Sequence, residues 1–138
     1  MRRPLGYLFK VITDKMIEKA DKDMEQYGLT FTQSRVLGFL RDKECVTQKE
    51  IEKHLEVSHP TVVGIVSRME QNGFVTTWFD PADKRNKMVK LTEKAKKTGE
   101  LLEASAKIHD REMFYFLTEE EIVQLGDMLT RIYEHFSR

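Results

Sequence analysis

Residues 58–92 read SHPTVVGIVSRMEQNGFVTTWFDPADKRNKMVKLT, and this stretch decides the fold. Ser58 is of a residue type that caps helix N-termini, and Pro60 follows in the first turn, where proline is tolerated. These residues predict a helix that runs to Asn72 and stops at Gly73. The stretch therefore opens with a helix that has a defined start and a defined end.

A β-hairpin is predicted directly after this helix. The segment FVTTWF, residues 74–79, is rich in β-branched and aromatic side chains, which favours a strand. The segment KMVKL, residues 87–91, predicts the returning strand, and the polar loop between the two contains Pro81. A helix followed at once by such a hairpin is typical of a winged helix-turn-helix when a second helix precedes it.

That second helix is predicted immediately upstream. Thr47 with Glu50 forms a capping box, and Ile51 and Leu55 supply the apolar positions of a short helix. A short helix, a tight turn and a second capped helix make a helix-turn-helix. We therefore expect residues 30–92 to form a winged helix-turn-helix DNA-binding region.

Long amphipathic helices are predicted at both ends of the chain. Apolar residues recur at helical spacing over residues 4–27 and again after Thr118. Their apolar faces need a partner, and the simplest partner is the same helices of a second copy. We expect a single chain, residues 1–138, that is mainly α-helical with a small β-hairpin wing, and in which residues 1–29 and 93–138 are dimerisation helices.

The charges are unevenly distributed along a chain whose 23 basic and 23 acidic side chains balance. Residues 84–97 hold seven basic side chains against one acidic side chain, Glu93, whereas residues 98–138 hold four basic and nine acidic ones. Zero net charge argues against a nonspecific polyanion binder, but it conceals a positive patch. An ordinary solvated face also carries such runs, so the patch needs structural context before it indicates a partner.

The composition, with 40% apolar and 33% charged residues, suits a folded domain with a soluble surface. No run of about 18 apolar residues exists, so we expect no membrane-spanning segment. Lys10, Asp14 and Lys15 interrupt the apolar residues near the N-terminus, which argues against a signal peptide. The single cysteine, Cys45, cannot form an internal disulfide, and we expect a cytoplasmic protein.

The predicted helix after Ser58 has an apolar face, with Val62 and Val66 among its residues, and an opposite face of small residues. A helix that enters the major groove of DNA needs small residues there, so that its backbone can approach the base edges. Close packing against another helix would also explain Gly64, and an ordinary helix with an unremarkable outer face remains an alternative. The DNA contacts that we expect from this helix are His59, Pro60, Thr61, Val63, Gly64, Ser67 and Arg68.

The loop between the two strands carries a second set of expected DNA contacts: Lys84, Arg85, Asn86 and Lys87. The lysines can lie along phosphates, and Arg85 can enter the narrow, strongly negative minor groove. Asp83 lies two residues before Arg85, close enough to brace it. The alternative is a solvated loop with no partner.

Three motifs point to one protein family. They are GYLFKVITDKMIEKADKDMEQYGLTFTQSRVLGFL near the N-terminus, LTEKAKK after the wing, and the wing pattern of Asp-x-Arg followed by Val-x-Leu-Thr. That wing pattern consists here of Asp83, Arg85, Val89, Leu91 and Thr92. Over nearly its whole length the chain resembles the MarR family of bacterial transcription factors, most closely its multidrug-efflux repressor members. One departure is Ala95, which stands where glycine is common, and we expect it to alter only helix propensity.

The resemblance implies a triangular dimer with intertwined N- and C-terminal helices. It implies recognition helices in successive major grooves of DNA and wing arginines in the flanking minor grooves. It also implies an effector pocket between the dimer helices and the winged region. Phe9, Met16 and Phe39 could line such a pocket, although each is equally at home in a hydrophobic core.

No residue pattern indicates a metal site or catalysis. The histidines (His54, His59, His109 and His135) pair neither with one another nor with Cys45 at a metal-ligand spacing on one helix, and we expect no metal and no cofactor. The sequence shows no nucleophile–base pair and no glycine-rich phosphate loop, so we expect no enzyme activity. Cys45 could sense oxidants, but a structural thiol suits its position between two helices better.

These features predict a homodimeric repressor that binds a pseudo-palindromic operator in double-stranded DNA. We expect it to lose affinity for the operator when a small apolar or aromatic effector binds. The alternative is a winged-helix module that docks a protein and reads no DNA sequence. The basic loop at Arg85 and the small outer face at Gly64 favour DNA.

Overall fold

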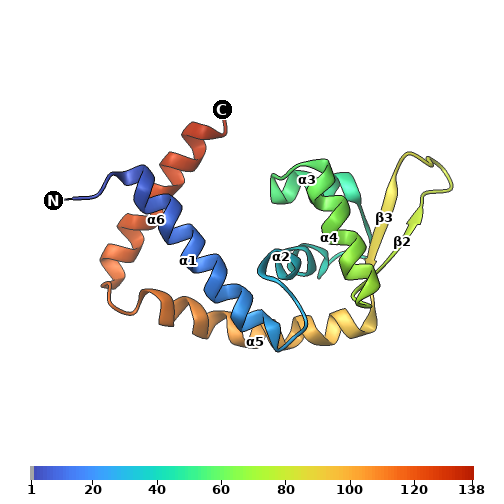
Figure 1. Ribbon diagram of the computed structural model, residues 1–138, viewed down its shortest axis with the longest axis horizontal. Coiled ribbons are helices and arrows are strands. Elements are labelled where there is room, and N and C mark those ends of the chain that lie inside the picture. The colour runs from blue at the N-terminus through green and yellow to red at the C-terminus, as the bar shows by residue number, and fades with distance from the viewer. Residues whose placement is uncertain (1) are drawn as a thin grey trace. The chain divides into compact units, whose positions relative to one another are not determined.

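The computed structural model describes residues 2–138, except for the side chains of residues 105–110. The chain is mainly α-helical with one small antiparallel sheet, as the sequence predicted (Figure 1). Its elements are α1 (Leu5–Glu25), α2 (Phe31–Leu40), β1 (Val46–Thr47), α3 (Gln48–Leu55), α4 (His59–Gln71), β2 (Val75–Phe79), β3 (Lys87–Leu91), α5 (Glu93–Phe114) and α6 (Glu119–Phe136). The chain divides within α5 into two compact units, of which the first ends at Glu100 and the second begins at Leu101.

The sheet consists of three strands in the order β1-β3-β2. β2 and β3 form the predicted hairpin, with Val75 opposite Leu91 at its base and Phe79 opposite Lys87 near its tip. The strand β1, whose two residues pair with β3 in front of α3, was not predicted from the sequence. Two residues are too few to show the alternation that predicts a strand, and β1 is a strand only because it pairs with β3.

Side-chain caps begin the helices where the sequence placed them. Thr30, Thr47 and Thr118 each complete a capping box, and Ser58 accepts a hydrogen bond from the backbone N–H of Thr61. Thr92 caps α5, because its Oγ1 accepts from the Ala95 backbone N–H at 3.2 Å. These local bonds satisfy backbone donors that a helix start would otherwise leave unpaired.

The hydrophobic core lies in the winged region and joins α2, α3, α4, the sheet and the start of α5. The predicted apolar face of α4 is buried, with Val62, Val66 and Met69 all at 0% exposure. Burying such a side chain contributes about 1.5–3 kcal/mol, so this face fixes α4 on the domain. Ala95 is also 0% exposed, and the expectation that it matters only for helix propensity is wrong, because its methyl group is part of this core.

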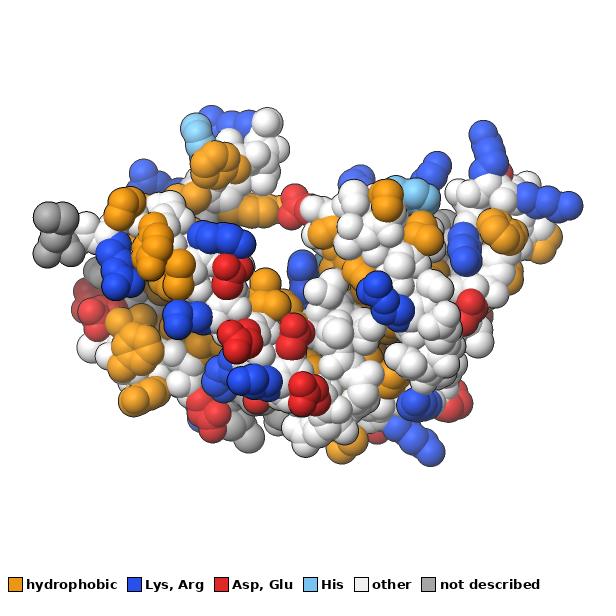
Figure 2. All heavy atoms as spheres, viewed as in Figure 1, with side chains coloured by type: hydrophobic (Ala, Val, Ile, Leu, Met, Phe, Trp, Pro, Cys, Tyr) orange, Lys and Arg blue, Asp and Glu red, His pale blue; other side chains and the backbone are white. Residues whose placement is uncertain are grey.

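Helices α1 and α6 bury no residue in the single chain, and all their residues are described. Large apolar side chains stand on both, for example Leu5 at 74% exposure on α1 and Phe136 at 81% on α6. Figure 2 shows hydrophobic side chains gathered on the surface over α1. Apolar faces of this size usually mark an interaction site in a soluble protein.

Candidate nucleic-acid interface

The outer face of α4 is small and open. Thr61, Val63, Ser67 and Arg68 are exposed, and Val63 retains 39% of its surface. A Cβ added to Gly64 would meet no described atom within 4 Å, so packing within this chain does not require a glycine there. Close helix packing inside the chain is therefore not the reason for Gly64, and its backbone is accessible to an approaching partner.

His59, the first residue of α4, is held by a carboxylate from α3. Its Nδ1 lies within hydrogen-bonding distance of Glu52 Oε1, and the His59 side chain is 67% exposed while that of Glu52 is 19% exposed. An ionised carboxylate only accepts hydrogen bonds, so Nδ1 carries the proton in this pair. The ring is thereby oriented with Nε2 as the nitrogen that remains for a contact outside the chain.

The turn between α3 and α4 depends on a residue in an unusual conformation. Glu56 has φ 56° and ψ 42°, in the left-handed region, and its backbone N–H donates to Glu52 O at 2.9 Å. A glycine usually occupies such a position after a helix, since a side chain there costs roughly 1–2 kcal/mol. This turn sets the direction in which α4 leaves α3. Nothing in the local sequence predicted a glutamate in the left-handed conformation.

We define the wing as residues 75–91, which are β2, β3 and the loop between them. Backbone hydrogen bonds shape the tip of this wing. Asp80 N donates to Asn86 O at 2.9 Å, and Asn86 N donates to Asp83 O at 3.0 Å. The Asp80 side chain accepts from Ala82 N at 3.0 Å. Asn86 therefore helps to close the loop through its backbone, and the tip is an ordered turn.

The predicted brace between Asp83 and Arg85 is present as a two-pronged pair. Arg85 Nε donates to Asp83 Oδ1 and Arg85 Nη2 donates to Asp83 Oδ2, both at 3.0 Å. These hydrogen bonds lower the pKa of Asp83 below its ordinary value of 3.8, with a smaller contribution from the positive charge of Lys49, and they raise the pKa of Arg85. The Arg85 side chain is 87% exposed, so the pair presents an oriented guanidinium to solvent.

The remaining cations near the wing divide into two groups. Lys84 is exposed at the tip, and Lys87 stands with its Nζ 6.0 Å from the centre of the Phe79 ring. Figure 2 shows the Lys and Arg side chains projecting from the tip of the hairpin. Lys94 and Lys96 are engaged within the chain, because Lys94 Nζ donates to Asn72 O at 2.7 Å and Lys96 Nζ pairs with Glu93 at 3.3 Å. Lys84 and Lys87 therefore stand beside Arg85 at the tip, whereas Lys94 and Lys96 each have a partner in the chain.

The three expected effector contacts lie on two helices. Phe9 and Met16 on α1 are 44% and 37% exposed, so neither is a core residue of the single chain. Phe39 on α2 is half-buried, and its ring is stacked on that of His54 with 4.2 Å between the two centroids. The Nζ atom of Lys43 lies 4.2 Å from the centroid of the Phe39 ring. The phenyl ring of Phe39 thus already has two partners in the chain.

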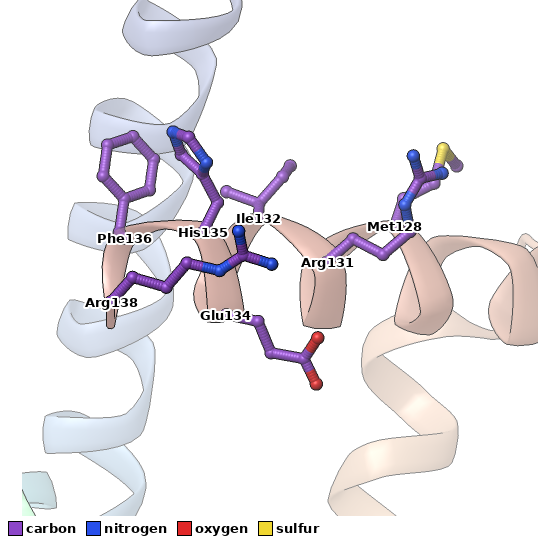
Figure 3. A pocket seen from close by; sticks show the side chains of 7 residues that line it. All are labelled: Met128, Arg131, Ile132, Glu134, His135, Phe136 and Arg138. Atoms are coloured by element: carbon purple, nitrogen blue, oxygen red, sulfur yellow. The ribbon is translucent and has the colours of Figure 1, made fainter.

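A hollow on α6 contains none of these three residues. Figure 3 shows its lining, which comes from the last part of that helix and from the residue Arg138 beyond its end: Met128, Arg131, Ile132, Glu134, His135, Phe136 and Arg138. A hollow with walls from one helix and the residues that follow it is an open surface, and we assign no ligand to it.

Other residues considered in the sequence have plain environments. Cys45 is a half-buried free thiol. Among the described residues, no group of three or more His, Cys, Asp or Glu side chains could hold a metal ion, and His109 lies outside the described side chains. None of the helices in the described part of the chain is long and apolar enough to cross a membrane.

Comparison with known families identifies the winged region. Residues 27–86 match the family model described as MarR family. This segment is a MarR-family winged-helix region. An uncharacterized HTH-type transcriptional regulator from Bacillus subtilis, YwoH, is 42% identical over 83 residues, which are 60% of this chain and 60% of YwoH. The chain thus spans less than two thirds of the length of that relative.

Solved structures of family members resemble the whole chain. A complex of Staphylococcus aureus MepR with DNA has a TM-score of 0.89 at 29% identity, over 97% of this chain and 99% of MepR. A mutant MarR from Escherichia coli in complex with operator DNA has a TM-score of 0.85 at 26% identity, over 94% of this chain and 93% of MarR. The fold is therefore that of MarR-family winged-helix proteins, as the sequence motifs indicated.

Proposed function

We propose that the chain is a transcriptional regulator, not an enzyme, that binds a pseudo-palindromic operator in double-stranded DNA as a homodimer and represses transcription. The observation that carries this proposal is the oriented Arg85 guanidinium at the tip of the wing, in the same compact unit as the small, open face of α4. The similarity to MepR and MarR, whose structures were determined with DNA, supports it.

In this proposal α4 is the recognition helix. Val63 and Gly64 allow its backbone to approach the base edges of the major groove, and Thr61 and Ser67 supply hydroxyl groups that can hydrogen-bond to bases or phosphates. His59 and Pro60 occupy the first turn, where the end of a recognition helix meets the groove. Arg68 lies farther along and contacts a phosphate.

The wing supplies the second contact. Because Asp83 already orients the guanidinium, Arg85 loses less conformational freedom when it enters the minor groove than an unbraced arginine would. Lys84, Asn86 and Lys87 contact the phosphates on either side. These contacts add positive charge where the DNA backbone is negative, so binding weakens as salt rises.

Residues 30–92 act as the DNA-binding region in this proposal, and residues 1–29 and 93–138 act as dimerisation helices. The support is the exposure of apolar side chains along α1 and α6, which a second copy would cover. We also propose that the protein works in the cytoplasm and that a small apolar or aromatic effector, bound near Phe9, Met16 and Phe39, lowers its affinity for the operator.

Selection of bound sequences from random duplex DNA by the purified protein tests this function. We expect an enriched motif with two-fold symmetry, whose half-sites lie about one helical turn, or about 10 base pairs, apart. Recovery of no motif, or of a motif without two-fold symmetry, would contradict a dimeric operator-binding regulator.

A further inference from the structure

A carboxylate near the end of the recognition helix reaches the middle of the first strand of the wing. Glu70, in the last turn of α4, accepts two hydrogen bonds from Thr77 in the middle of β2. Its Oε2 lies 3.0 Å from the Thr77 backbone nitrogen and within hydrogen-bonding distance of the Thr77 hydroxyl group. One oxygen atom therefore receives both the backbone donor and the side-chain donor of the same strand residue.

The position of Thr77 explains why this link is needed. β2 is the outer strand of the sheet and pairs with β3 only, so one of its edges has no neighbouring strand. Without Glu70 the Thr77 backbone N–H would have no strand to pair with at that edge, and Glu70 accepts from it. The carboxylate thus takes the place of a missing strand at one point.

Two further hydrogen bonds near the end of α4 lie at the base of the hairpin. Phe74 N donates to Met69 O at 2.9 Å, and Thr92 Oγ1 donates to Gly73 O at 2.7 Å. Both hold the chain where it leaves the helix and where it returns to α5. Glu70–Thr77 is attached farther out along β2, closer to the tip that carries Arg85. A small rotation about the base moves the tip most, so a bond farther out restrains the tip better than one at the base.

Charge gives a second argument. Glu70 is the single acidic residue in α4, whose sequence is HPTVVGIVSRMEQ. A carboxylate on a helix that binds DNA repels the phosphates, so a benefit elsewhere must offset this cost. Its two bonds to Thr77 provide that benefit.

We infer that Glu70 is a positioning residue that sets the angle between the recognition helix and the wing, so that α4 and Arg85 reach their two grooves together. The inference rests on the proposed operator binding. It predicts that Glu70 affects DNA affinity through Arg85, and not through its own charge or through folding.

A double-mutant cycle on the full-length protein tests it, with the operator obtained from the selection experiment. Glu70→Ala is compared with the parent, with Arg85→Ala and with the double variant. Thr77→Val keeps the size of the side chain and removes its hydroxyl donor, and it serves as the second variant if Glu70→Ala folds poorly. Glu44→Ala is the charge-matched control, because Glu44 is an exposed carboxylate in the loop before β1.

We expect Glu70→Ala to weaken operator binding about tenfold, because each half of the dimer loses the two hydrogen bonds that hold β2 to α4. Glu44→Ala should leave binding unchanged or slightly tighter. In the Arg85→Ala background the loss caused by Glu70→Ala should disappear, because there is no wing arginine left to position. Thr77→Val should give a smaller loss with the same dependence on Arg85, since Glu70 still accepts from the Thr77 backbone N–H.

Hydrogen exchange of the Thr77 amide gives a readout that requires no DNA. It should be faster in Glu70→Ala than in the parent. If the parent binds the operator and Glu70→Ala binds equally well, or if the losses of Glu70→Ala and Arg85→Ala simply add, the positioning role is refuted and the proposed function stands. A parent protein that binds no operator refutes the proposed function, and the positioning role with it.

Discussion

Replacement of Arg85 by alanine is the sharpest test of the wing. The guanidinium is 87% exposed and its one ion pair, with Asp83, lies at the surface, so the folded protein has little to lose. We expect the melting temperature of Arg85→Ala to stay within about 2 °C of the parent, as for other exposed substitutions. The effect on DNA binding should be far larger.

The size of that effect follows from the geometry at the tip. A good arginine contact in a DNA groove is worth about a factor of ten, and the symmetric dimer carries two, so we expect about a hundredfold loss of affinity. The substitution also leaves the Asp83 carboxylate, now without its partner, at the surface that meets DNA. Asp83→Asn in the Arg85→Ala background should therefore recover part of the lost affinity.

Titrations of labelled operator DNA across a salt series measure these effects. Removal of one phosphate interaction from each wing should flatten the plot of log affinity against log salt by about 1.8, which is about 0.9 for each half of the dimer. Lys84→Ala and Lys87→Ala should change this slope with a smaller loss of affinity, because both lysines bind phosphates. Arg85→Lys keeps the charge and removes the planar two-pronged donor, so it separates the two contributions.

The outcome that would refute the reasoning is an Arg85→Ala protein with the affinity and the salt slope of the parent. The wing would then be a solvated loop. An Arg85→Ala protein that melts well below the parent would show instead that the Asp83 pair supports the fold.

Three further predictions concern the dimer, the recognition helix and Asp83. Sedimentation should find a dimer at micromolar concentration, because α1 and α6 expose their apolar faces in the single chain, and a folded monomer would contradict this. Thr61→Arg should change the selected operator sequence, since a base contact is worth about 1–3 kcal/mol of discrimination, and an unchanged sequence would mean that α4 does not read bases. By NMR the Asp83 carboxyl group should have a pKa below its ordinary value of 3.8, and this pKa should rise toward that value in Arg85→Ala, which loses the guanidinium but keeps the backbone N–H that donates to Asp83 Oδ1. Because the pKa is lowered, the pair persists at neutral pH and is lost only as the pH falls through the lowered pKa, so operator binding between pH 6 and 8 should not change through Asp83. A titration at the ordinary value in the parent would show that the pair does not form in solution.

Local chemistry in the sequence determined the elements of the fold. Thr30, Thr47 and Thr118 start helices because each offers a hydroxyl group to backbone donors only three residues away. The β-branched and aromatic run before Asp80 and the return at Lys87 predicted the hairpin for the same reason, since both strands and their turn are adjacent in the chain. The brace between Asp83 and Arg85 spans two residues and was also within reach of the sequence.

The tertiary structure alone decided which distant residues meet. β1 exists because Val46 pairs with Val89, and Glu70 meets Thr77 because a turn at Gly73 brings the strand back beside the helix. In the same way Lys94, which the sequence placed in the positive patch, donates a hydrogen bond from its Nζ to Asn72 O. Such contacts depend on the path of the chain between the partners, and residue type and spacing carry no record of that path. The sequence therefore determined the helices, the hairpin and the family, whereas the way in which the recognition helix is held to its wing required the folded chain.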